Sequence, residues 1–446
     1  MLKRKWMIVL VPFLIAAMFL VTGCPEEEVV PPVDPNDEPP DEPPVDEIVI
    51  TVAGGAVGME LELTQRLAEA YTEEHEGVTV EVLDTPDDAT ERLGLYLQFF
   101  EAQSGEVDVY QIDVIWPGDL AEHFVDLYDY GAGEVVDAHF PEIVENNTVD
   151  GALIGIPWFT DAGLLYYRTD LLEEYGFDVP ETWDDLEEAA QVIQDGERAE
   201  NPDFQGFVWQ GNAYEGLTTN ALEWIDSNDG GTIVSPDQVI TINNERAIEI
   251  VDQAAGWVGT ISPEGVTTFA EEDARAVWHA GNAAFMRNWP YAYALSAQED
   301  SAVTDVFNVT SLPAGASGEG SATLGGWQLA VSRYSEHPEV AADVALYMAN
   351  YESQKMRAID GTMIPTIMDL YEDEDVLDAH PWFEELYDVF INAVARPSTA
   401  TAPQYSAVSE LFFSAVHDVL TGQMNAADAF EILELDLEDL LGFPTE

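Results

Sequence analysis

Short apolar runs alternate with amphipathic segments along most of the chain. Residues 48–52 and 78–83 have the length and composition of strands, and residues 107–115 form a longer apolar-rich run. Between these runs, residues 59–75 and 89–103 show the spacing of apolar positions that is typical of helices. The order strand, helix, strand, helix, strand predicts a largely parallel sheet that is flanked by helices.

The same alternation continues to the C-terminus. Residues 164–168 are predicted to form another strand, and further helices are predicted over residues 170–175, 183–196, 338–350, 381–395, 406–420 and 426–441. We find no internal repeat. The chain is therefore expected to be an α/β protein, and roughly 400 foldable residues suffice for two or more domains at ~100 to 200 residues each.

The N-terminus has the parts of a secretory signal peptide. A basic head at residues 3–5 precedes an apolar run over residues 6–21. This run is shorter than the ~20 residues that a membrane span needs. Residues 20–24 resemble a bacterial lipobox, in which the cysteine is acylated. We therefore expect residues 1–23 to be removed and Cys24 to anchor the protein to the outer face of the cell membrane; the alternative is a free thiol and a released protein.

An acidic, proline-rich tether is predicted to follow the anchor. Residues 25–47 contain eight prolines and ten acidic residues, and no aromatic residue. Such a segment is stiff and extended, and at ~3.1 Å per residue it would reach ~70 Å from a membrane. Residues 24–47 are thus interpreted as a lipidated cysteine with its tether. Because Cys24 is the only cysteine, the folded part contains no disulfide and no thiolate metal site.

The charge balance is strongly acidic. Asp and Glu number 87 against 14 Lys and Arg, for a formal charge of −73, and Lys355 is the only lysine after the signal segment. At ~1 M salt the Debye length falls to ~3 Å, so the repulsion between surface charges is screened. This composition indicates adaptation to high salt. A disordered acidic protein is disfavoured by the 47% apolar content, and nucleic acid is excluded as a partner because a polyanion would be repelled.

Local motifs of common enzyme classes are absent from the sequence. We find no nucleophile elbow, no zinc-protease helix motif and no phosphate-binding loop. The seven histidines never occur at metal-ligand spacing, so neither a metal nor a cofactor is expected. Gly54, Gly55 and Gly58 lie between a strand and a helix but lack the dinucleotide spacing. A glycosidase needs two carboxylates flanking a bond; the abundance of acids leaves that possibility open, although no local motif supports it.

Polar residues within apolar or aromatic runs are the more informative candidates. Asp113 and Asp161 each lie in such a run, where a charge is costly unless something binds it; the alternative is an ordinary edge or turn aspartate. Trp289, Tyr291 and Trp327 stand beside turn-forming residues, and the alternative for them is core packing. A pyranose has apolar faces that pack on aromatic rings and hydroxyls that need donors and acceptors. A sugar site explains the combination.

Four stretches carry a family resemblance: residues 112–117, 161–172, 288–291 and 325–327. Together they resemble the trehalose/maltose-binding proteins of ABC importers, within the maltose-binding-like family of solute-binding proteins. The resemblance spans about residues 48–441. It implies a type II periplasmic-binding fold with two α/β lobes, each a mainly parallel sheet flanked by helices, and a sugar in the cleft between them. The N-terminal lobe would comprise residues 47–160 and 307–358, and the C-terminal lobe residues 161–306 and 359–446.

The resemblance also implies a set of ligand contacts. Carboxylates and guanidinium groups would bind sugar hydroxyls, rings would stack on the sugar, and one glycine backbone would approach it closely. Phe159 stands where a tyrosine is expected in close relatives, which would remove one hydroxyl contact. The implied residues are Glu60, Arg92, Asp113, Phe159, Asp161, Trp289, Tyr291, Gly326, Trp327 and Arg396.

The expected function is capture of a disaccharide, trehalose or maltose, for the permease and ATPase subunits of an ABC importer. The protein would act as a monomeric, lipid-anchored, extracellular or periplasmic binding protein without a cofactor, and not as an enzyme. Three alternatives remain: the same fold binding glucose, an oligosaccharide or a polyol; a secreted glycoside hydrolase; and a structural or adhesive surface protein.

Overall fold

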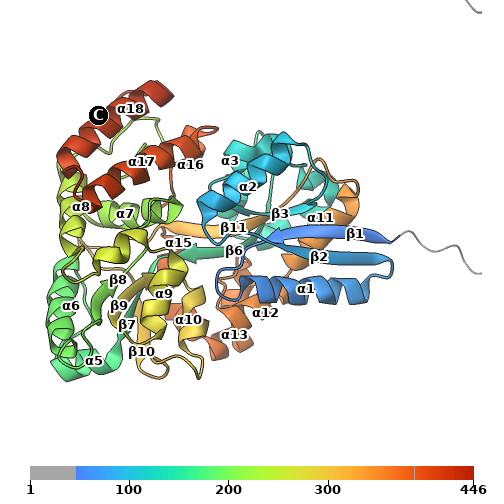
Figure 1. Ribbon diagram of the computed structural model, residues 1–446. Helices are drawn as coiled ribbons and strands as arrows, with labels where there is room; N and C mark the ends of the chain where they lie inside the picture. The colour runs from blue at the N-terminus through green and yellow to red at the C-terminus, as the bar shows by residue number, and fades with distance from the viewer. Residues whose placement is uncertain (1–46, 386, 446) are drawn as a thin grey trace, which may run out of the picture. The chain divides into compact units, whose positions relative to one another are not determined.

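Five strands form the first sheet, in the order β2-β1-β3-β11-β6 (Figure 1). The computed structural model describes residues 47–385 and 387–445, so the predicted signal peptide, Cys24 and the tether up to residue 46 lie outside the described residues. The strands of the first sheet are β1 Ile48–Gly54, β2 Val78–Asp84, β3 Val109–Asp113, β6 Ile156–Ala162 and β11 Leu324–Val331.

Four strands form the second sheet, in the order β10-β7-β9-β8. They are β7 Leu164–Arg168, β8 Gln205–Val208, β9 Ala283–Asn288 and β10 Phe307–Thr310. A separate hairpin consists of β4 Thr148–Val149 and β5 Ala152–Leu153.

The sheets are mixed, so the predicted mainly parallel pairing is wrong. β1 pairs in parallel with β2 and β3, as the βαβαβ pattern predicts. β11, however, runs antiparallel to both β3 and β6, and β7 runs antiparallel to both β9 and β10. The reason is that the chain enters β11 from the second sheet rather than through a helix crossover, which would give parallel strands. The predicted α/β class itself is confirmed.

Two segments carry the chain between the sheets. β6 ends at Ala162 in the first sheet and β7 begins at Leu164 in the second, so only Gly163 separates them. The chain returns from β10 in the second sheet to β11 in the first. β10, which the predicted division assigns to the N-terminal lobe, pairs with β7 of the second sheet. The predicted division into two lobes stays a prediction.

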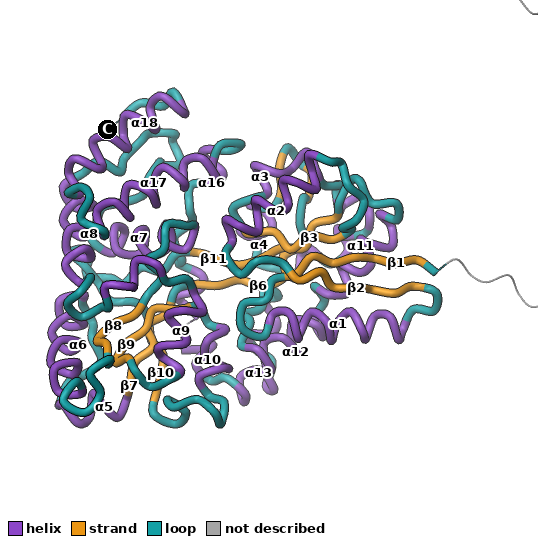
Figure 2. Tube along the Cα trace, viewed as in Figure 1, coloured by secondary structure: helices purple, strands orange, loops and turns teal. Residues whose placement is uncertain are grey.

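Helices cover both sheets, as Figure 2 shows. In the first half of the chain they are α1 Glu60–Glu74, α2 Ala89–Glu101, α3 Pro117–Leu120, α4 Pro141–Asn146, α5 Thr169–Tyr175, α6 Trp183–Glu197 and α7 Glu215–Ser227. The second half contains α8 Glu245–Trp257, α9 Glu271–His279, α10 Tyr291–Ser296, α11 Pro338–Met348, α12 Tyr351–Gly361, α13 Glu374–Ala379, α14 Trp382–Glu385, α15 Tyr387–Ile391, α16 Ser398–Thr401, α17 Tyr405–Leu420 and α18 Ala426–Leu441. Short 3₁₀ turns are η1 Ala121–His123, η2 Leu127–Tyr130, η3 Ala132–Glu134, η4 Val136–Ala138, η5 Glu264–Thr268 and η6 Met368–Tyr371.

The helix predicted over residues 381–395 ends early. The last helical residue of α15 is Ile391, and Val394 forms a parallel bridge with Thr323 instead. Backbone hydrogen bonds tie Val394 to the segment that enters β11. Arg396 directly precedes Pro397, and a residue before proline is pushed towards an extended conformation. This extended segment delivers Arg396 to the site.

Local sequence explains the helix starts that matter for the site. β1 ends at Gly54, and the following turn, with Gly58 at φ +59°, leads directly into α1. Glu60 is therefore the first residue of α1 and lies at the carboxyl end of the sheet. The side chain of Asp88 caps α2 by accepting hydrogen bonds from the backbone of Thr90 and Glu91.

Candidate functional site

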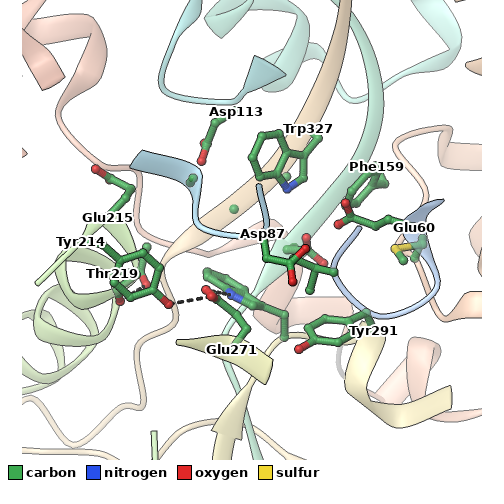
Figure 3. Close-up of a pocket in the computed structure, with 18 of the residues that line it drawn as sticks. Glu60, Asp87, Asp113, Phe159, Tyr214, Glu215, Thr219, Glu271, Tyr291 and Trp327 are labelled. Atoms are coloured by element: carbon green, nitrogen blue, oxygen red, sulfur yellow. Dashed lines mark hydrogen bonds between the residues drawn. The ribbon is translucent and has the colours of Figure 1, made fainter. Parts of the chain in front are cut away.

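One pocket gathers most of the predicted site residues (Figure 3). Its lining comes from strands β3, β6 and β11 of the first sheet, from the starts of helices such as α7 and α9, and from the turn that follows β9. Nine of the ten predicted residues line it: Glu60, Asp113, Phe159, Asp161, Trp289, Tyr291, Gly326, Trp327 and Arg396. Residues as far apart in the sequence as Glu60 and Arg396 thus converge on one pocket, and their roles towards a ligand stay predictions.

Arg92 is the one predicted residue that does not line the pocket. It is fully buried on α2, where Nε donates to the carbonyl oxygen of Pro86 at 2.9 Å. Its guanidinium carbon lies 4.3 Å from the ring centre of Trp327. Arg92 therefore backs this ring by a cation–π contact, and its Nη1 and Nη2 have no hydrogen-bond partner among the described residues.

Strand register brings an aromatic ring and a carboxylate together. Trp327 of β11 and Asp113 of β3 are direct partners across the antiparallel pair. Gly326 precedes Trp327 and has φ +119°, a conformation that favours glycine. A Cβ atom at Gly326 would lie 2.6 Å from the carbonyl oxygen of Phe159 on β6. The glycine predicted to let a ligand approach is thus required by the neighbouring strand.

Arg396 links a carboxylate of the first sheet, on β3, to a carboxylate at the start of helix α7. Its Nη2 donates to Oδ1 of Asp113 at 2.8 Å, and its Nη1 donates to Oε1 of Glu215 at 2.9 Å. Glu215 begins α7 and also accepts from the hydroxyls of Tyr405 and Ser409, at 2.6 and 2.5 Å. Burial raises the pKa of Glu215, while the charge of Arg396 acts in the opposite direction. The guanidinium group therefore holds both carboxylates at the pocket wall.

Two further carboxylates are buried with few partners. Burial raises the pKa of Glu60, although Arg92 and Arg357 oppose the shift, and Gln111 donates to Glu60 at 3.3 Å. Burial raises the pKa of Asp161 well above its usual value, and the nearby charge of Glu60 adds to the shift. Oδ1 of Asp161 has no hydrogen-bond partner among the described residues. Because a buried acceptor without a donor is costly, Asp161 is suited to accept a hydrogen bond from a ligand.

Hydrogen bonds fix the orientation of the aromatic rings. Nε1 of Trp289 donates to Oε1 of Glu271 at 3.2 Å. The hydroxyl of Tyr214 donates to Oε2 of the same carboxylate at 2.6 Å (Figure 3). The hydroxyl of Tyr291 donates to Oε1 of Glu272 at 2.8 Å. The rings are thereby held at their polar edges, which leaves their faces for packing.

The sequence reasoning missed several lining residues. Glu215 and Glu271 are each the first residue of a helix, α7 and α9. The search for polar residues within apolar runs overlooks helix starts. A search for acids at the first position of a helix that follows a strand would have found Glu215. The complete missed set is Val57, Asp87, Ala89, Tyr214, Glu215, Gly216, Thr219, Glu271 and Met363, together with Gly325 from a motif that had been noted.

The chemistry of this pocket is that of binding groups. Carboxylates greatly outnumber guanidinium groups in its lining, and flat rings supply the apolar surface. Within residues 47–385 and 387–445, His, Cys, Asp and Glu do not form any group of three that could hold a metal ion. Among the same residues, every helix is too short or too polar to cross a bilayer. Acceptor groups beside aromatic faces suit a ligand that has many hydroxyl donors and apolar C–H faces.

Comparison with known proteins gives consistent results. The family model for bacterial extracellular solute-binding proteins matches residues 59–355. A Deinococcus radiodurans protein named a probable ABC transporter-binding protein is 49% identical over 89% of this chain and 94% of its own length. The maltose-bound structure of T. maritima MalE3 is 38% identical with a TM-score of 0.84, over 88% of this chain and all of that chain.

More distant structures share the fold. A ribitol complex of a solute-binding protein from Agrobacterium radiobacter K84 is 20% identical with a TM-score of 0.78, over 89% of this chain and all of that chain. The architecture is thus the type II, maltose-binding-like periplasmic-binding fold that the motifs predict. On the family match and the extent of these similarities, the chain belongs to the family of bacterial extracellular solute-binding proteins.

Proposed function

We propose that this protein is the extracellular sugar-binding component of an ABC importer and that its ligand is a disaccharide of the maltose or trehalose type. The observation that carries the proposal is the pocket itself, which five aromatic residues and six carboxylates line together. The name of the Deinococcus relative supports the link to an ABC transporter. The bound maltose of the T. maritima protein supports the class of ligand.

Each lining group has a proposed role. The rings of Phe159, Trp289, Tyr291 and Trp327 stack on the apolar faces of the sugar. The carboxylates of Glu60, Asp113 and Asp161 accept hydrogen bonds from its hydroxyls, and Arg396, which lies beside Asp113, donates to them. Phe159 offers a face but no hydroxyl. Arg92 acts through Trp327, which it contacts, and not on the sugar directly.

Delivery to an importer requires two states of the protein. The two proposed lobes close on the sugar, and the permease reads the closed form. An open form remains populated, because otherwise the sugar could not be released. The protein is proposed to act as a monomer, held at the outer face of the membrane by the acylated Cys24 and its tether.

High salt is proposed as the working environment. The formal charge of −73 gives a repulsion that salt screens. We expect the melting temperature to rise steadily from about 0.1 M to about 2 M NaCl. Sucrose at matched water activity is the control, because it stabilises proteins without screening charge. Equal melting temperatures at both salt concentrations would contradict the proposal.

Titration calorimetry against a sugar panel in molar salt tests the proposed function. The panel contains maltose, trehalose, glucose, a longer maltodextrin and ribitol. Tight binding of a disaccharide supports the proposal, and heat from none of these ligands overturns it. Preferential binding of ribitol would favour the second candidate, a polyol-binding protein, for which the Agrobacterium complex gives the precedent.

The same samples test the alternative of a glycoside hydrolase. Family members serve transport rather than catalysis, and we propose that this chain does too. Incubation of the protein with maltose and trehalose, followed by proton NMR, should therefore show unchanged disaccharide. Release of glucose in proportion to protein concentration would instead establish hydrolysis.

A further inference from the structure

A buried ion pair lies behind the pocket wall. Glu223 is on α7 and Arg287 is on β9, and their side chains are 0% and 1% exposed. Nε of Arg287 donates to Oε2 of Glu223 at 2.9 Å, and Nη2 donates to the second carboxylate oxygen. Neither residue lines the pocket. Such a two-point contact fixes the guanidinium plane as well as its position.

The guanidinium group of Arg287 lies over the ring of Trp289, which lines the pocket. Its central carbon is 3.9 Å from the ring centre of Trp289. The remaining nitrogen, Nη1, donates to Oε1 of Gln210 at 3.1 Å, and the side-chain amide of Gln210 donates back to the carbonyl oxygen of Arg287 at 3.1 Å. All three nitrogens of the Arg287 guanidinium group are therefore held by hydrogen bonds, and the group packs over the ring of Trp289.

The same pair contacts both segments that connect the sheets. The backbone N–H of Thr323, which precedes β11, donates to Oε1 of Glu223 at 3.3 Å. At Gly163, between β6 and β7, an added Cβ atom would lie 2.1 Å from Oε1 of Glu223 and 2.6 Å from Nη2 of Arg287. One ion pair thus touches the first connection, the second connection and the back of a pocket ring.

Stability alone is a weak reason for such a pair. Burying two charges costs solvation free energy that their attraction often fails to exceed, so a buried ion pair is poor evidence of stabilisation. The pair instead fixes the position of a neighbouring ring. A planar cation that is held by a carboxylate and an amide is a rigid support for an aromatic face.

We propose that Glu223 and Arg287 are positioning residues of the sugar site, which hold Trp289 at the angle that the sugar needs and tie it to both connections between the sheets. The pair touches no ligand. Its effect on sugar affinity rests on the proposed function, whereas its effect on Trp289 does not. A change in the pair should therefore alter the environment of Trp289 even in the sugar-free protein.

Three variants probe the pair. Glu223→Gln keeps the shape and removes the charge, Arg287→Lys keeps the charge and removes the flat face, and Gly163→Ala pushes a methyl group between the two side chains. Gln194→Met is the matched control, because Gln194 is a buried polar residue of α6 that bonds Thr260 and Gly206 away from the pocket. Circular dichroism identifies the variants that fold, and only these are compared.

Two measurements decide the outcome. Calorimetry should show the sugar Kd rising about tenfold in the pair variants, the size of a lost desolvated cation–π contact, but staying within about twofold in Gln194→Met. In protein labelled with 5-fluorotryptophan, the ¹⁹F resonance that Trp289→Phe removes should shift and broaden in the pair variants without sugar, and not in the control.

The proposal is overturned if folded pair variants keep both the wild-type Kd and the wild-type Trp289 resonance, or if Gln194→Met changes both to the same extent. Because the fluorine spectrum needs no ligand, it tests the positioning of Trp289 even if the wild-type protein binds no sugar of the panel. If the wild-type protein binds no sugar of the panel, the proposed function is wrong, and the proposal on Trp289 is still decided by the fluorine spectrum.

Discussion

The carboxylate of Asp119 binds the start of helix α17 at Ser406. Oδ2 of Asp119 accepts from the backbone N–H of Ser406 at 3.0 Å and from its hydroxyl at 2.7 Å. Asp119 lies on α3, just after β3 of the first sheet. Helix α17 packs against α7 and α8, and α7 is joined to the second sheet by the Glu223–Arg287 pair. The contact therefore connects the two halves of the fold without lining the pocket.

Asp119→Ala should weaken sugar binding although Asp119 is not a lining residue. A carboxylate that caps a helix is worth about 1 kcal/mol. Because this cap forms only when α3 and α17 meet, its loss should favour an open arrangement and raise the sugar Kd about fivefold. Calorimetry gives the Kd, and small-angle scattering should give a larger radius of gyration for the sugar-free variant.

Asn425→Ala is the matched control for this prediction. Asn425 caps α18 by accepting from the backbone N–H of Asp428 at 2.9 Å, and both residues belong to the same half of the fold. This variant should lose a similar amount of stability and keep the wild-type Kd. Equal losses of affinity in both variants would show that Asp119 contributes only to folding.

Gly55→Ala should weaken sugar binding by displacing the side chains of Glu60 and Arg92. A Cβ atom at Gly55 would lie 2.0 Å from Oε2 of Glu60 and 2.7 Å from Nη2 of Arg92, so both side chains must move. We expect a rise in the sugar Kd of at least about tenfold, the cost of misplacing a charged hydrogen-bond acceptor. Gly94→Ala on α2 is the control, because no atom lies within 4 Å of the added methyl group. It should raise the melting temperature, as alanine favours a helix over glycine, and leave the Kd unchanged.

The hydrophobic pattern predicted the regular part of the fold. The alternation over residues 48–115 gave β1, α1, β2, α2 and β3 in the right order. It could not give the antiparallel pairing of β11, because the direction of a strand depends on where the chain enters the sheet and not on its composition. The chain also leaves its helical pattern after Ile391, where a backbone pairing between Val394 and the segment entering β11 overrides local preference.

The predicted site followed from residue type in unusual surroundings. Asp113 and Asp161 were found because a charge within an apolar run demands an explanation, and both line the pocket. Glu215 and Glu271 escaped because an acid at a helix start looks like ordinary helix chemistry. The sequence placed Arg92 on the right helix. It could not show that the guanidinium group packs on Trp327 and that Arg92 is absent from the pocket lining.

Trp327→Ala should remove most of the affinity for a disaccharide. The ring lies beside Asp113 across the β3–β11 pair and is backed by Arg92. An aromatic contact with its buried area is worth about 2 to 3 kcal/mol, so the Kd should rise about 30- to 150-fold. Tyr128→Ala removes an exposed ring outside the pocket, at 39% exposure, and should leave the Kd as it is. Full affinity in Trp327→Ala would remove the stacking role of this residue.

Asp161→Asn should stabilise the sugar-free protein at neutral and alkaline pH while weakening sugar binding. Burial raises the pKa of Asp161 well above its ordinary value of 3.8. The folded state therefore holds the carboxyl proton of Asp161 more tightly than the unfolded state does. The wild-type protein loses stability as the pH rises from the pKa of Asp161 in the unfolded state to its higher pKa in the folded state. Asparagine carries no charge at any pH and avoids this loss. The melting temperature of the variant should thus exceed that of wild type at about pH 8. The difference should shrink as the pH falls below the ordinary pKa of 3.8, where Asp161 is mostly protonated in both the folded and the unfolded state.

Thermal unfolding across this pH range, with Asp436→Asn as the matched control, checks the sign. Asp436 is exposed on α18, so replacing it should change the melting temperature little and without a trend in pH. Calorimetry at about pH 8 should show a weaker sugar complex for Asp161→Asn, because an amide accepts hydrogen bonds less strongly than a carboxylate. A variant that is less stable than wild type at about pH 8 would mean that the charge of Asp161 is stabilised by partners within the fold. The unpartnered Oδ1 would then no longer mark the place of a sugar hydroxyl.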